Sequence, residues 1–92
     1  MLRREMGCTA EEFLRWLPGA SRSAPVHIDC GTAVIQAAGG TIRVTFEQAP
    51  ARRIGLIALP VLNVAFRFSG METAAREAFM AYFDLYTKRG GG

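Results

Sequence analysis

The chain has 92 residues, which corresponds to one small domain near the lower end of the usual size range. Half of the residues are apolar and 21% are charged, as in average globular proteins, so the composition argues against intrinsic disorder. Ten of the eleven basic residues are arginines, and they are spread along the chain. The net charge of +3 therefore does not indicate the clustered basic patch of a nucleic-acid-binding domain.

The cysteine content and the apolar segments bear on the compartment. Two cysteines, Cys8 and Cys30, are too few for a disulfide-stapled secreted domain, and no signal peptide precedes them. The longest uncharged apolar run, residues 54–66, is too short to span a bilayer. We therefore expect a cytoplasmic protein with no membrane contact.

The first helix is predicted by a capping box. Residues 1–8 are polar and are expected to form a flexible N-terminus. Thr9 and Glu12 have the spacing at which each side chain accepts from the other's backbone amide. The helix that follows is expected to stop at Pro18-Gly19 and to bury one stripe, made of Phe13, Leu14 and Leu17.

A short strand and a hairpin are predicted next. Residues 26–30 alternate in polarity, with Cys30 on the apolar phase as a small buried residue. Gly39-Gly40 is typical of a two-residue hairpin turn, which would set Ile35 opposite Val44. That register places one set of residues on a common apolar face: Ala33, Ile35, Ala37, Ile42, Val44 and Phe46.

The second half of the chain is expected to contain a loop, further strands and a long helix. Residues 48–53 have the composition of a loop, and residues 62–68 alternate as a strand. Whether 53–59 and 61–68 are two strands or one bent strand is left open, because Pro60 marks an edge, a bulge or a corner. Beyond Phe68 the polarity pattern indicates an amphipathic helix.

A second capping box at Ser69–Glu72 is predicted to start this helix. Its buried side is expected to consist of Met71, Ala75, Ala78, Phe79, Tyr82, Phe83 and Tyr86. Asp84 and Lys88 form an i,i+4 pair on the other side, and Gly90 suits the C-terminal cap before a glycine tail at 90–92.

These elements define the expected architecture. It is a two-layer α+β sandwich over residues 9–89, with an antiparallel sheet of about four strands. A short N-terminal and a long C-terminal helix lie on one face, in the order α-β-β-β-β-α. This order resembles the β-α-β4-α arrangement of TATA-binding-protein-like folds with its first strand missing. The likeness is one of element order, with no shared motif, and it carries no function.

No motif in the sequence predicts a catalytic, cofactor or metal site. A glycine-rich phosphate loop, a nucleophile elbow and paired metal-ligand motifs are all missing. His27 and Asp29 share a strand face, but Cys30 has the opposite phase, so the three do not converge as zinc ligands. Phe46, Phe66 and Phe68 occupy the buried phase, whereas an RNA-binding sheet exposes its aromatics. Nucleic-acid binding is therefore unexpected.

Two surfaces remain as candidates. The sheet face opposite the helices is expected to be solvated, to contact another subunit or to bind an anionic ligand, with Arg43 and Arg67 as forks for carboxylate or phosphate. The candidate ligand residues there are His27, Asp29, Arg43, Glu47 and Arg67. Apolar residues off the core phase indicate instead a subunit interface, namely Ile57, Leu59, Val61 and Met80.

The leading functional hypothesis is a small non-enzymatic module that acts through self-association, as a homodimer, or through another protein. The alternative is a binding protein or small enzyme for an anionic metabolite. Weak nucleic-acid binding is the third.

Overall fold

The structure, a computed structural model, describes residues 1–37 and 39–88. In chain order the elements are β1 (Leu2–Met6), α1 (Ala10–Ala20), β2 (Val26–Asp29), β3 (Thr32–Ala37), β4 (Gly40–Ile54), β5 (Ile57–Ser69) and α2 (Thr73–Lys88).

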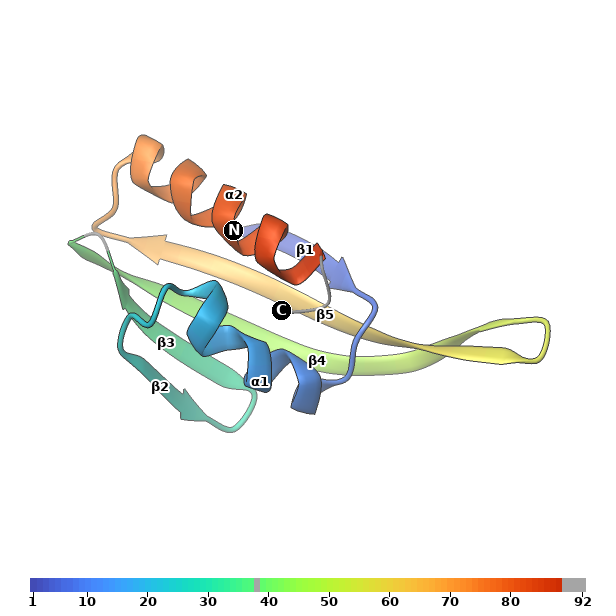
Figure 1. Cartoon of the computed structure of the whole chain (residues 1–92). Coiled ribbons are helices and arrows are strands. Elements are labelled where there is room, and N and C mark those ends of the chain that lie inside the picture. The colour runs from blue at the N-terminus through green and yellow to red at the C-terminus, as the bar shows by residue number, and fades with distance from the viewer. Residues whose placement is uncertain (38, 89–92) are drawn as a thin grey trace.

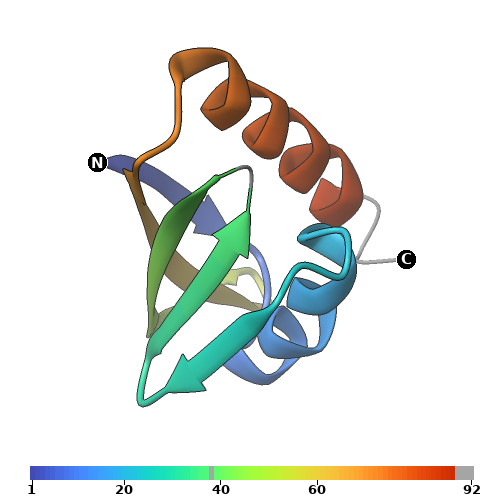
Figure 2. The ribbon, with the colours of Figure 1, turned by 90° about the vertical axis from the view of Figure 1, so that its left-hand side faces the viewer.

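The five strands form one antiparallel sheet in the order β1-β5-β4-β3-β2, and the two helices cover one of its faces (Figure 1, Figure 2). The predicted two-layer α+β class is confirmed, with five strands where about four were expected. No helix in the described ranges is long and apolar enough to cross a membrane.

The fifth strand corrects the expectation of a flexible N-terminus. β1 pairs with β5 along its whole length, from Leu2 opposite Phe66 to Met6 opposite Leu62. The structure therefore contains the first strand that the sequence did not predict, and the order of its elements is β-α-β4-α. The sequence did not reveal it because Arg4 occupies an inward position, which breaks the expected apolar alternation. Arg4 is stabilised there by Asp84 of α2, whose two carboxylate oxygens accept from its Nε and Nη2 at 3.1 and 2.9 Å.

The predicted capping box of α1 is confirmed. The Glu12 amide donates to the Thr9 hydroxyl at 3.1 Å, and the Thr9 amide donates to the Glu12 carboxylate at 2.9 Å. The predicted stop at Pro18 is wrong, because α1 continues to Ala20. Pro18 lacks an N–H to donate and its ring crowds the preceding turn, but the last turn of the helix still forms, since the Ser21 amide donates to the Leu17 carbonyl at 2.9 Å.

The β2–β3 turn places Cys30 differently from the prediction. Asp29 pairs with Thr32, so Cys30 and Gly31 form a two-residue turn with φ angles of +32° and +75°. Positive φ at both positions matches the right-handed twist of the strands. Cys30 is consequently exposed rather than buried in the core.

The β3–β4 hairpin has the predicted faces but a register shifted by two residues. Ile35 lies opposite Ile42 rather than Val44, and Ala37 pairs with Gly40. A shift of two keeps every side chain on its face, so the hydrophobic pattern alone could not detect it. Residue 38 lies outside the described residues. Gly39 has φ +74°, whereas Gly40 is already in β4, where a Cβ would collide with the Ser69 carbonyl oxygen.

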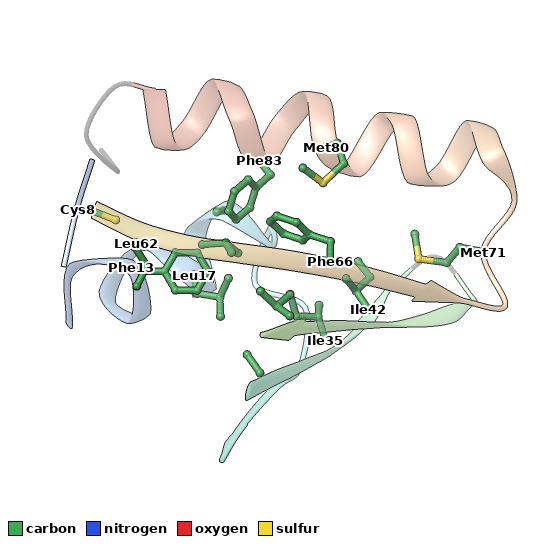
Figure 3. Packing of buried hydrophobic residues seen from close by; sticks show 14 residues of the cluster. Cys8, Phe13, Leu17, Ile35, Ile42, Leu62, Phe66, Met71, Met80 and Phe83 are labelled. Carbon is green, nitrogen blue, oxygen red and sulfur yellow. The ribbon is translucent and has the colours of Figure 1, made fainter. Parts of the chain in front are cut away.

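The core lies between the sheet and the two helices (Figure 3). Phe66 of β5 meets Phe83 of α2 edge-to-face at 4.9 Å between ring centroids, and Phe13 of α1 approaches Phe83 at 6.2 Å. One aromatic cluster thus joins both helices to the sheet. The fully buried side chains around it include Leu17, Ile35, Ile42, Val44 and Leu62.

The long C-terminal helix starts later than predicted, and its buried side matches the prediction at Ala75, Phe79, Phe83 and Tyr86, which belong to the core or pack against it. Ser69 ends β5, and α2 begins only at Thr73, so the capping box at Ser69 is wrong. Met80, expected on the exposed side, is buried with 7% of its surface accessible, whereas Ala78 is exposed. Figure 3 shows Met80 directed toward Phe66. β1 widens the sheet beyond β5, and this extra width covers the helix side that carries Met80. The predicted cap at Gly90 and the tail at 90–92 lie outside the described residues.

Candidate functional site: the β4–β5 arm and the open sheet face

The β4–β5 hairpin extends beyond the rest of the sheet. β3 pairs with β4 only as far as Thr45, and β1 pairs with β5 only from Leu62 onward. Residues 49–61, called the arm here, therefore form a two-stranded ribbon with no strand on either side (Figure 1). The predicted loop at 48–53 is wrong, and β5 is one strand that passes through Pro60. A shift in register between Ala49 and Arg52 marks a bulge in the arm.

The base of the arm is fixed by polar contacts. The Gln48 amide nitrogen donates to the Val61 carbonyl at 2.9 Å, and its oxygen accepts from the Ala10 amide at 2.7 Å. Farther out, Arg52 forms an ion pair with Glu5 of β1 at 2.6 Å. These contacts connect the arm to β1 and to the start of α1, so its direction is set by the body of the protein.

The outer part of the arm exposes large apolar side chains. Ile54 is 58% exposed, Ile57 61%, Leu59 43%, and Leu56 at the turn is fully exposed. Leu62 points into the core, so the odd-numbered residues of β5 face the other side of the sheet. Ile54 lies opposite Ile57 and shares that side. Together these residues form the apolar stripe of the arm, defined as Ile54, Ile57, Leu59 and Val61.

Three of the four residues predicted for a subunit interface lie in this stripe. Ile57 and Leu59 are exposed and Val61 is half-buried. Met80 does not join them because it belongs to the core. The sequence found the stripe through the phase of β5, but it did not predict Ile54 or Leu56, since the extension of β4 past Pro50 was not expected.

All five predicted ligand residues lie on the open face, which is the sheet face opposite the helices. Arg43 of β4 is directly opposite Arg67 of β5, and Glu47 lies four residues farther along β4. His27 and Asp29 are on the edge strand β2, where His27 is separated from Arg43 by Val34 of β3. The structure therefore brings the two arginines together and leaves the other three candidates apart from them.

Arg3 is a further charged residue of the open face that the sequence analysis missed, because β1 was not predicted. It lies opposite Ala65 of β5, which is two residues from Arg67. The open face is hollowed here. One depression, of about 530 Å³, is lined by Arg3, Thr45 and Ala65 among others. A second depression beside it, of about 210 Å³, is also lined by Thr45 and Ala65, together with Arg43 and Arg67.

Titratable groups elsewhere do not assemble a reactive centre in the part of the chain that the structure describes. No three His, Cys, Asp or Glu side chains lie close enough there to hold a metal ion. Cys8 is buried, and this burial, aided by the negative charge of Glu12, raises the pKa of its thiol. A neutral buried thiol behaves as a small apolar side chain. Hydrogen bonding to Asp84 raises the pKa of Arg4, so that pair stays charged.

Comparison with known proteins gives no functional assignment: no protein family matches the chain, and no curated protein or solved structure is significantly similar to it. The arm and the open face are the features of the described structure that bear on function.

Proposed function

We propose that this protein is a small interaction module that forms a homodimer through the apolar stripe of its arm. The observation that carries the proposal is the exposure of four large aliphatic residues on one narrow ribbon, Ile54, Leu56, Ile57 and Leu59. Contiguous apolar surface of this kind usually marks a contact with another molecule. Two free cysteines agree with a module that works in the reducing cytoplasm.

The size of the stripe is consistent with a reversible association. Full burial of one such side chain contributes about 1.5–3 kcal/mol, and these side chains are already partly covered. Two arms in contact would gain on the order of 10 kcal/mol, against an association cost of about 4–15 kcal/mol. The net gain is therefore at most about 6 kcal/mol, and we expect a dissociation constant between about 0.05 and 1 mM.

A face-to-face contact is favoured over the addition of a strand along the edge of the arm. Pro50 in β4 and Pro60 in β5 each lack the N–H that a neighbouring strand would require. Proline and charged residues on a strand edge also discourage such pairing. With strand addition along its edges disfavoured, the arm can contact a partner through its apolar stripe.

A second copy of the chain can supply the cover that the apolar stripe lacks. Two arms packed antiparallel through their stripes would form a self-complementary two-fold contact, in which the same residues meet from both copies. Arg53 pairs with Ala58 and therefore lies on the opposite side of the ribbon, outside this contact.

Sedimentation equilibrium between 10 µM and 1 mM (roughly the expected range) tests this proposal. We expect a monomer–dimer equilibrium whose dissociation constant rises at least about tenfold in the variant Ile57→Lys, since a charge would be buried in the contact. Leu85→Lys is the matched control, because Leu85 is 53% exposed on α2, outside the arm. A wild-type protein that stays monomeric at the highest concentration, or a dimer equally insensitive to both substitutions, would contradict the proposal.

A further inference from the structure

Independently of the arm, we propose that the open face binds a phosphate-bearing small molecule through Arg3, Arg43 and Arg67, called the arginine cluster here. Arg43 and Arg67 are directly opposite on neighbouring strands, where Cβ atoms are about 4.5–5.5 Å apart. Arg3 pairs with Ala65 and is thus diagonal to Arg67, at about 7–8 Å. Three flexible guanidinium groups can therefore reach one point above the sheet.

The cluster lacks internal neutralisation. Like charges directly opposite each other destabilise a sheet. The ion pairs in the described part of the chain use other arginines, namely Arg4, Arg15 and Arg52. Glu47 is four residues from Arg43 along a strand, or about 13 Å, which is too far for a direct pair. An external dianion would remove this repulsion and accept several charge-assisted hydrogen bonds, for which the arginine fork is well suited.

The floor of the cluster leaves room for a ligand. Arg3, Ala65 and Thr45 form one cross-strand row beside the Arg43–Arg67 pair, and Ala65 and Thr45 line both adjacent depressions. Ala65 presents only a methyl group, and Thr45 is exposed, with a hydroxyl that can donate to an oxyanion. The depressions, of about 530 and 210 Å³, can hold a phosphate group together with part of the molecule that carries it.

The acidic residues on this face restrict the ligand. Glu5 and Glu47 line the far side of the larger depression. Glu5 is paired with Arg52, so Glu47 is the carboxylate that would repel a second anionic group, and the remainder of the ligand should be uncharged or cationic. For the same reason a nucleic-acid strand fits poorly, because its successive phosphates would have to pass this carboxylate. The arginine cluster is a single anion site rather than a basic track.

Titration with inorganic phosphate, followed by backbone amide NMR shifts at ionic strength held constant with sodium chloride, tests the proposal. We expect saturable shifts at Arg43, Thr45, Ala65 and Arg67. The double variant Arg43→Gln/Arg67→Gln should raise the dissociation constant at least about tenfold, because two charged donors are lost. Arg53→Gln removes an arginine on the arm and should leave the dissociation constant within about twofold.

The phosphate-free stability of the same variants gives a second readout. Loss of the opposed charges should raise the melting temperature of the double variant by about 1–3 °C. If that variant does not fold, Arg67→Lys keeps the charge without the fork and should still weaken phosphate binding several-fold. Equal shifts with chloride alone, unchanged phosphate affinity in the variants, or binding of a labelled oligonucleotide without any phosphate response would each overturn the proposal.

Discussion

Cys8 and Cys30 show how a single position determines the chemistry of a side chain. Cys8 lies between β1 and α1 and is buried against the core. Cys30 occupies a turn with positive φ, where few residues other than glycine are comfortable. The two thiols should therefore differ in reactivity, because alkylation requires both access and the thiolate form.

We predict that iodoacetamide modifies Cys30 rapidly and Cys8 only after unfolding. At pH 8, labelling of Cys30 should be faster by about tenfold or more, since burial both shields Cys8 and keeps it protonated. Peptide mass spectrometry after timed labelling measures both rates. Comparable rates in native buffer would mean that Cys8 is not packed as described.

The raised pKa of Cys8 also predicts a pH dependence of stability. The folded protein holds this thiol neutral above its ordinary pKa of 9.0, whereas the unfolded chain releases the proton there. The contribution of Cys8 is complete below that pH and is lost as the pH rises through the higher folded value. Between pH 8 and 10, urea unfolding of wild type should lose stability more steeply than Cys8→Ala, with Cys30→Ala parallel to wild type. Parallel slopes for wild type and Cys8→Ala would contradict this.

Among the secondary-structure elements, β1 shows what sequence patterns cannot reveal. α1 and the inner parts of β4 and β5 were predictable, because capping residues and regular alternation are local signals. β1 is formed by contacts distant in sequence: it pairs with β5, and its inward Arg4 meets Asp84, which is 80 residues away. Without β1, neither the burial of Met80 nor the position of Arg3 beside Arg67 could be predicted. The open face was inferred correctly because a register error of two leaves side chains on their faces.

We predict that β1 is held to α2 by the Arg4–Asp84 pair. The bidentate contact is partly exposed, so Asp84→Asn should lower the free energy of unfolding by about 0.5–1 kcal/mol. Glu11→Gln serves as the control, because its ion pair with Arg15 is 3.7 Å long and well exposed. Urea melts compare the two variants, and hydrogen exchange should show faster exchange in β1 for Asp84→Asn alone. Equal effects would show that β1 does not depend on α2.

The molecule as a whole has an asymmetric shape that links its fold to its proposed role. Its principal extents are 46, 25 and 21 Å, and the arm accounts for the long dimension (Figure 1). The core ends near Leu62, where the helices cease to cover the sheet, yet β4 and β5 continue as a pair. Ordering the two strands beyond the core costs conformational entropy, and little apolar surface is buried there to offset it. A partner that covers the apolar stripe would supply that burial.

Amide NMR spectra recorded on dilution from 1 mM to 10 µM (about the expected dissociation range) locate the proposed contact most directly. We expect concentration-dependent shifts confined to the arm and centred on Ile57 and Leu59, with the α2 amides unchanged. Shifts that fall on α2 instead, or no shifts at any concentration, would contradict self-association through the arm.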